Sequence, residues 1–301
     1  MQQPAQPSVE YPLNTAELDQ DEQALQQVLQ SAKSQRVPTM TQLVDLIAIN
    51  ELLGTVESSG DGKNANLVAQ LETESLAAKA AEFKTTNNDD TIGWIRIPNT
   101  NVDYPVVYKA GVENYAYYES KGYDKQYSKD GVIWADYECT FPELSQNTTL
   151  YGHNWHNIYT PRTQANMQAN DLMFSLVMSY NYTDFAQENP FVYFSTTEQD
   201  YVFQVFASYY TDLNFGYNYA QMSQEDFQKV IAEAKAKSLS NYNVPVTSED
   251  KIVTLSTCTR VHGNTNNQRF VVMAKLVPVG TPSTTISTHS NPIAYNSSID
   301  A

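Results

Sequence analysis

The chain places a cysteine and an arginine where two predicted strands follow one another. The run 252–258, IVTLSTC, is mostly branched or apolar and ends on Cys258, which predicts a strand. A polar loop then leads to a second predicted strand over 269–276, which begins with Arg269. If the two strands pair as a hairpin, both side chains lie at the same end of a sheet. A nearby cation favours the thiolate, which is the nucleophilic form of cysteine.

A histidine ends another predicted strand. His153 closes the run 148–153, and strand ends far apart in the sequence can meet at one mouth of a barrel. A cysteine with a histidine partner is the arrangement used for nucleophilic acyl transfer. From the residues alone, the alternative is a buried, inert Cys258 beside a structural histidine. His262 is expected to be a solvated loop residue, and His289 lies in the C-terminal tail.

Metal, cofactor and nucleic-acid chemistry are not expected. His153 and His156 form an isolated H-x-x-H pair, and the sequence has neither C-x-x-C nor H-E-x-x-H, so no zinc site is predicted. No glycine-rich phosphate loop occurs among the 11 glycines. The net charge of −16 argues against binding nucleic acid and against electrostatic docking to an anionic bilayer.

The two cysteines are expected to be free thiols. A bridge between Cys139 and Cys258 would remove the candidate nucleophile, and two cysteines make no disulfide framework. No window reaches the roughly 18 consecutive apolar residues of a membrane span, and no signal peptide is visible. The protein is therefore expected either to be cytoplasmic or to have an anchoring segment outside this sequence.

Composition divides the chain into four parts. Residues 1–15 are rich in Gln and Pro and are predicted to be disordered. Residues 16–90 read as a helical extension that forms a stalk or a packing element. Short strands with turns fill 91–277, and 278–301 is rich in Ser, Thr and Asn, which predicts a flexible tail. The helices of the extension are predicted at about 15–35, 41–53 and 65–83.

The part 91–277 favours a mainly β fold with inserted helices (α+β). It holds about seven or eight short strands, which are typical of a closed or partly closed antiparallel barrel. One helix is predicted at roughly 170–185. A longer amphipathic helix is predicted at 223–238, before the last two strands, where Ser223 and Asp226 form a capping box.

Several separated motifs together resemble one family. The run TLSTC at 254–258, followed by Arg269, resembles the active-site signature of the sortases, and Ser256 before Thr-Cys is similar to class B. The run YGHN at 151–154 resembles the catalytic histidine motif of that family. The runs GWIRIP at 93–98 and YPVV at 104–107 resemble the first barrel strands of class B.

The resemblance implies a sortase-like barrel and a sortase-type cysteine transpeptidase of the cysteine endopeptidase class. Such an enzyme works on the outer face of a Gram-positive cell, held by an N-terminal membrane anchor that is expected to lie outside this sequence. It cleaves a C-terminal sorting signal of a surface protein or pilin and joins the acyl half to an amine of peptidoglycan. The implied roles are Cys258 as nucleophile, His153 as general acid and then base, and Arg269 as stabiliser of the oxyanion.

Three further residues are expected to line the substrate groove: Tyr151, Ser256 and Thr257, although each could merely pack. Class B members often carry an acidic residue shortly after the cysteine, whereas 259–260 is Thr-Arg here. The long loop 154–170 either shapes the site or is a surface loop.

Two other functions stay open at this point. One is a class B-like sortase that polymerises pilins, with a pilin lysine as acceptor. The other is a surface-binding barrel without catalysis, which would keep its full function in a Cys258→Ala variant.

Overall fold

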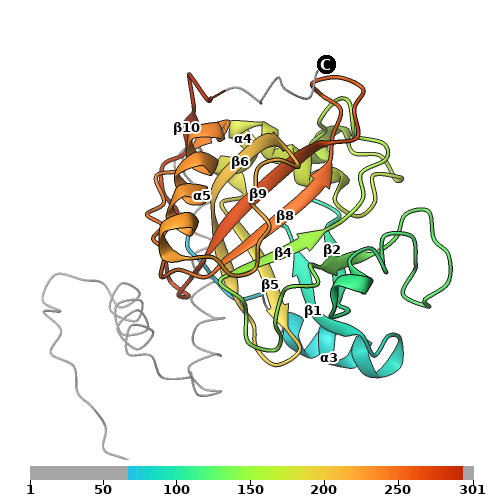
Figure 1. The fold of residues 1–301 in the computed structure, drawn as a ribbon. Helices are drawn as coiled ribbons and strands as arrows, with labels where there is room; N and C mark the ends of the chain where they lie inside the picture. Colours follow the sequence, from blue (N-terminus) through green and yellow to red (C-terminus); the bar gives the residue numbers. More distant parts are fainter. Residues whose placement is uncertain (1–66, 73, 294–301) are drawn as a thin grey trace, which may run out of the picture. The chain divides into compact units, whose positions relative to one another are not determined.

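The computed structural model describes residues 67–72 and 74–293 (Figure 1). Every described residue belongs to one compact unit of the chain, 66–301. The disordered segment predicted for 1–15 and the helices predicted at about 15–35 and 41–53 lie outside the described residues.

The described elements are, in chain order, α3 Leu76–Thr86, β1 Thr91–Arg96, β2 Asp103–Val107, η2 Val112–Asn114, β3 Ile133–Ala135, β4 Asn147–Tyr151, η3 Gln164–Asn166, η4 Ser175–Asn181, α4 Thr183–Glu188, β5 Phe191–Thr196, β6 Val202–Asp212, α5 Gln224–Lys237, β7 Ser240–Asn241, β8 Ile252–Cys258, β9 Gln268–Val277 and β10 Ser287–Thr288, where η marks 3₁₀ helices.

Eight strands close into one barrel. They follow the order β1-β2-β3-β4-β8-β9-β6-β5, and β1 pairs with β5 to complete the circle. The predicted closed, mainly β barrel with a few helices is therefore confirmed. Most neighbours are antiparallel, but β2 with β3 and β4 with β8 are parallel pairs. The predicted antiparallel barrel therefore contains two parallel pairs that the sequence did not indicate.

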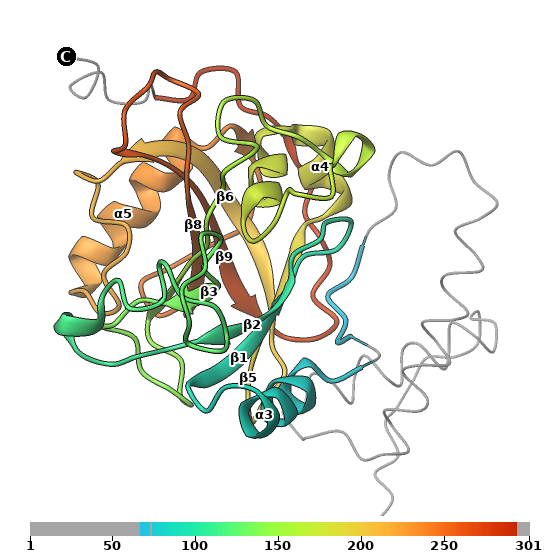
Figure 2. The same cartoon turned by 90° about the vertical axis from the view of Figure 1, so that its right-hand side faces the viewer.

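The strands around the candidate site are buried on both faces. All eleven residues of β6 are buried, and six of the seven in β8 are buried. Inward side chains fill the barrel, and outward side chains of β6 are covered by α5, which runs alongside that strand in both views (Figures 1 and 2). The run 202–210 is predominantly apolar, although it contains Gln204 and Ser208, and this composition reflects the two-sided burial.

Helix α5 confirms the amphipathic prediction at 223–238. The side chain of Ser223 accepts a hydrogen bond from the Asp226 backbone, so the first turn is capped. Phe227, Ile231 and Ala234 recur at helical spacing and are fully buried or nearly so. Burying a Phe or Ile side chain contributes about 1.5–3 kcal/mol, so this face fixes the helix on the barrel.

The helix predicted at about 65–83 begins only at Leu76. Residues 67–72 instead run beside the C-terminal segment, where Ala69 donates its backbone N–H to the Thr281 carbonyl at 2.7 Å. Helix α3 starts where Asp200 accepts hydrogen bonds from the Ser75 hydroxyl and the Ala77 N–H. The alanine-rich composition favours a helix throughout, but pairing with the distant segment overrides that local preference.

Two other parts differ from the sequence-based expectations. The single helix predicted at about 170–185 is split into the 3₁₀ helix η4 and the short helix α4. The described part of the predicted flexible tail, 278–293, packs against the rest of the unit. Its strand β10 pairs with β7, and His289 is hydrogen-bonded to the Ser238 carbonyl at 2.7 Å.

Candidate active site

The parallel pairing of β4 with β8 brings a histidine and a cysteine to one end of the barrel. Tyr151 is the register partner of Ser256. His153 follows two residues after the end of β4, and Cys258 is the last residue of β8. Parallel strands end at the same edge of a sheet, so both residues lie at the same mouth.

The arginine reaches this mouth through the next strand pair. Strand β9 runs antiparallel to β8, and Arg269 is the register partner of Cys258. Directly opposite residues of an antiparallel pair project on the same face with Cβ atoms about 4.5–5.5 Å apart. The thiol and the guanidinium therefore share one side of the sheet.

A cleft of about 350 Å³ lies at this mouth. All six residues predicted for the site line it: Tyr151, His153, Ser256, Thr257, Cys258 and Arg269. Cys258 and His153 are both half-buried, so each is packed in place while remaining open to the cleft.

The backbone beside His153 is tied to β8 by side chains. Thr257 donates its hydroxyl hydrogen to the Gly152 carbonyl at 2.7 Å, and Asn154 Nδ2 donates to the Cys258 carbonyl at 3.3 Å. A Cβ on Gly152 would lie 2.5 Å from Ile133 Cδ1 and 2.7 Å from Phe174 Cγ. Glycine therefore fits between these two side chains, whereas a larger residue would clash. These contacts hold the histidine and cysteine backbones in fixed relation.

The guanidinium of Arg269 is held by its own loop. Its Nη1 donates to the carbonyls of Asn266 and Gln268 at 2.8 and 2.9 Å. A guanidinium has five N–H donors and stays charged at all physiological pH values. Donors on Nε and Nη2 can therefore serve the cleft while Nη1 holds the group in place.

A family model of the sortase domain matches residues 95–277. The chain belongs to the sortase family. It is 30% identical to Sortase B of Staphylococcus aureus over 193 residues, 64% of this chain and 72% of that relative. It is 29% identical to Sortase B of Listeria monocytogenes over 191 residues, 63% of this chain and 71% of the relative.

A solved structure of Sortase B in complex with triglycine shares the fold. Its TM-score to this chain is 0.55 at 28% identity, over 68% of this chain and 89% of that one. These relatives confirm the class B resemblance, and the chain is a sortase transpeptidase.

The hydroxyls of the three predicted groove residues of this sortase are already engaged within the protein. Tyr151 donates to Asp136 Oδ2 at 2.7 Å, and Ser256 is hydrogen-bonded to the Tyr217 hydroxyl at 2.8 Å. Thr257 donates to the Gly152 carbonyl. All three line the cleft, and their contact with substrate stays a prediction.

A polar network on the cleft wall was not predicted from the sequence. Asp136, Tyr217 and Asn218 line the cleft, and Asn218 Nδ2 donates to the Tyr151 hydroxyl at 3.0 Å. Burial raises the pKa of both Tyr151 and Tyr217, so their hydroxyls stay protonated. Asp136 directly follows the mainly apolar run 131–135 of the sequence, and this position was the available signal, because strand ends meet at this mouth.

Replacing Asp136 with asparagine is expected to change how the free energy of unfolding depends on pH. Burial raises the pKa of the Asp136 carboxyl above its usual 3.8, while bonds from Glu138 N–H and Tyr151 oppose that rise. The stability linked to this group is therefore full below pH 3.8 and is lost as the pH rises through the folded pKa. Asparagine does not ionise, so it does not lose this stability. The free energy of unfolding of the variant therefore increases relative to that of the wild type as the pH rises.

Urea unfolding of both proteins at about pH 4 and about pH 7 gives the free energy of unfolding of each. The difference between variant and wild type is expected to be more favourable to the variant at about pH 7. Glu143→Gln, which alters an exposed carboxylate outside the cleft, is the matched control. A difference between Asp136→Asn and wild type that is equal at both pH values would contradict the expectation.

The residues after Cys258 point away from the cleft. Thr259 is buried and bonds to the Ile158 carbonyl, and Arg260 Nη2 donates to Asn266 Oδ1 at 2.6 Å. Neither lines the cleft, whose acidic lining residues are Glu119 and Asp136. Class B members often carry an acidic residue shortly after the cysteine. In this sortase, positions 259–260 bring no acidic side chain to the cleft.

Both cysteines are free, as predicted. Cys139 is only 2% exposed, and burial raises its pKa to about 12. We expect a thiol reagent at neutral pH to add one label to the folded sortase, on Cys258, and two labels to the unfolded chain. Intact mass measurement with peptide mapping checks this, and labelling of Cys139 in the folded protein would contradict it.

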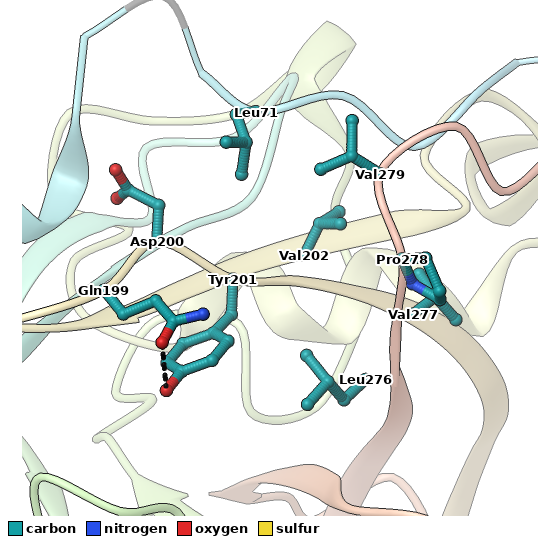
Figure 3. Close-up of a pocket in the computed structure, with 9 residues that line it drawn as sticks. All are labelled: Leu71, Gln199, Asp200, Tyr201, Val202, Leu276, Val277, Pro278 and Val279. Atoms are coloured by element: carbon teal, nitrogen blue, oxygen red, sulfur yellow. Dashed lines mark hydrogen bonds between the residues drawn. The ribbon is translucent and has the colours of Figure 1, made fainter. Parts of the chain in front are cut away.

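A second hollow lies away from these residues, at the far end of β9 (Figure 3). Its side chains are mostly apolar, and its polar members Gln199 and Tyr201 bond to each other at 3.4 Å. Asp200, at its edge, caps α3. None of the nine lining residues is a cysteine, histidine or arginine, so the candidate active site is the other cleft.

Within 67–72 and 74–293, no three His, Cys, Asp or Glu side chains gather closely enough to hold a metal ion. In the same residues, no helix has both the length and the apolar character to span a bilayer.

Proposed function

We propose that this sortase cleaves a C-terminal sorting signal through a thioester on Cys258 and transfers the acyl protein to an amine of cell-wall peptidoglycan. The observation that carries the proposal is the cleft shared by Cys258, its register partner Arg269, and His153. The proposed substrates, exported proteins and peptidoglycan, lie outside the cell membrane, which puts the reaction on the outer face of a Gram-positive cell.

In the first half-reaction, the Cys258 thiolate attacks the carbonyl carbon of the scissile peptide bond. The carbonyl oxygen becomes an oxyanion, which accepts hydrogen bonds from the Arg269 guanidinium. The carbon–nitrogen bond then breaks, and His153 gives its proton to the leaving amine. The products are a thioester on Cys258, a released peptide and a neutral imidazole.

In the second half-reaction, an acceptor amine attacks the thioester carbonyl. His153, now neutral, takes a proton from the attacking nitrogen, and Arg269 again stabilises the oxyanion. The carbon–sulfur bond breaks, which restores the Cys258 thiolate and the imidazolium. The related Sortase B structure that holds triglycine supports an amine acceptor, because a glycine peptide begins with a primary amine.

Mass spectrometry of the intact enzyme tests the proposal. The sortase is incubated with a panel of sorting-signal peptides, without and then with an acceptor amine. We expect an adduct with the mass of the acyl half, mapped to Cys258, that disappears as the amine is added and the joined product forms. An enzyme that releases product without any adduct on Cys258, even after acid quenching, would contradict the proposal.

The same experiment separates the two acceptors. A peptidoglycan stem peptide and a lysine-containing pilin peptide are offered at equal concentration. Preferential transfer to the stem peptide is expected, and transfer to the pilin lysine alone would favour the pilin-polymerising alternative.

A further inference from the structure

The imidazole of His153 is surrounded by Trp155, Glu119 and Gly131. We call these three residues the socket of His153, and it controls which ring nitrogen can exchange a proton. We propose that Trp155, together with the backbone carbonyl of Glu119, positions the imidazole so that Nε2 stays protonated and Nδ1 carries the exchangeable proton. This proposal rests on the proposed acid–base role of His153. Trp155 acts through His153 and is therefore a positioning residue.

One face of the imidazole is covered by an indole. The rings of His153 and Trp155 stack with centroids 4.9 Å apart and planes at 29°. The indole is itself held, because Trp155 Nε1 donates to the Lys129 carbonyl at 3.1 Å. Trp155 is 41% exposed, but this hydrogen bond holds its indole in place. Trp134 contacts the imidazole as well, with centroids 5.9 Å apart.

One edge of the imidazole is closed by backbone. His153 Nε2 lies 2.6 Å from the Glu119 carbonyl oxygen, and a carbonyl can only accept, so Nε2 carries a hydrogen. A Cβ on Gly131, which has φ +57°, would lie 3.1 Å from His153 Cδ2 and 2.7 Å from the Glu119 oxygen. Glycine at this position thus leaves room for the ring and for its hydrogen bond.

This arrangement determines the route of the proton. With Nε2–H bonded to Glu119, a neutral His153 accepts at Nδ1, and the imidazolium donates from Nδ1. Both halves of the proposed reaction can then use Nδ1 without breaking the Glu119 bond. The second torsion of a histidine side chain is broad and roughly two-fold. A ring that is free to turn would present the wrong nitrogen part of the time.

The charged groups around the socket do not supply this control. Lys129 Nζ lies 5.5 Å from the Trp155 ring centroid, on the indole and not on the imidazole. Glu119, Asp136 and Arg269 line the same cleft, but the imidazole donates to the backbone carbonyl of Glu119 and not to its carboxylate. The stacked indole and the carbonyl are therefore the contacts that orient His153.

Kinetics of Trp155→Ala, Trp155→Phe and a control give the first test. A misplaced catalytic group costs up to about 100-fold in rate, so we expect kcat of Trp155→Ala to fall by about tenfold or more with KM little changed. Trp155→Phe keeps a stacking ring and should recover most of the loss. Tyr159→Ala removes an exposed aromatic of the same loop, which bonds to Asn264, and should match the wild type.

A loss confined to KM in Trp155→Ala would overturn the proposal, because it would make Trp155 a substrate contact. Failure of Trp155→Phe to recover activity, with the fold intact by circular dichroism, would also overturn it.

Nitrogen-15 NMR of the imidazole in the full chain gives a test that does not depend on turnover. At alkaline pH we expect His153 to be the Nε2–H tautomer in the wild type and in Trp155→Phe, and a mixture of tautomers in Trp155→Ala. A spectrum unchanged by Trp155→Ala would overturn the proposal. Full activity of His153→Ala would instead overturn the acid–base role of His153. The tautomer measured by NMR would not be affected by that result, because it does not depend on turnover.

Discussion

Transpeptidation is expected to fall by a factor on the order of 10³ or more when Cys258 is replaced by alanine. The thiol supplies the bond that holds the acyl intermediate, and no other residue lining the cleft is a cysteine. The substitution removes one half-buried atom and should leave the fold intact. Product formation from a sorting-signal peptide and an amine, together with the intact mass of the enzyme, measures both the rate and the loss of the adduct.

Cys139→Ala is the matched control for this experiment. It removes the other thiol, which is buried beside the Asn147 carbonyl, and it should keep the wild-type rate and the adduct. If Cys258→Ala instead kept full function, the thioester mechanism would be wrong and a non-catalytic role for the barrel would be favoured.

The sequence was informative where local pattern and topology agree. The strand ending on Cys258, the strand beginning at Arg269 and the helix at 223–238 were predicted at almost their observed bounds. The two strands are short, mainly apolar runs joined by a polar loop, and the helix repeats its apolar residues at helical spacing. The pairing of Cys258 with Arg269 follows from a hairpin, which local sequence can predict.

The convergence of His153 on that pair depends on a contact that local sequence does not encode. It requires β4 and β8 to be parallel neighbours, although they lie far apart in the sequence. The place of His153 at a strand end made this meeting possible, and the family resemblance of the histidine motif then supported it. Trp155 escaped notice for the same reason, because its significance lies in its contact with His153 and not in any local pattern. Asp136 had only its position after an apolar run as a signal, and its bond to Tyr151 could not be predicted from that position.

The misplaced start of α3 and the packed C-terminal segment have a related cause. Residues 67–72 look helical by composition, and 278–293 look flexible. They pair with each other through Leu67, Ala69, Gly280 and Ser283. Two segments that are weakly determined alone become ordered by pairing across the ends of the domain, which propensity cannot predict.

Replacing Arg269 with lysine is expected to lower kcat by about 10²–10³, the range seen when one oxyanion donor is removed. The positive charge is kept, so the result depends on geometry. Lysine is a point charge on a flexible stem, and it cannot hold two loop carbonyls while presenting further fixed donors to the cleft. Thioester formation should slow, whereas labelling of Cys258 by a thiol reagent should continue.

Arg260→Lys is a demanding control, because Arg260 contacts the same loop residue, Asn266, but does not line the cleft. It should perturb the loop to a similar extent and leave kcat within about twofold of the wild type, because Arg260 is half-buried outside the cleft. Equal losses in the two variants would mean that loop order, and not an oxyanion contact, accounts for the effect. A large loss in Arg269→Lys alone, with the burst of acyl-enzyme slowed, would tie the guanidinium to the reacting carbonyl.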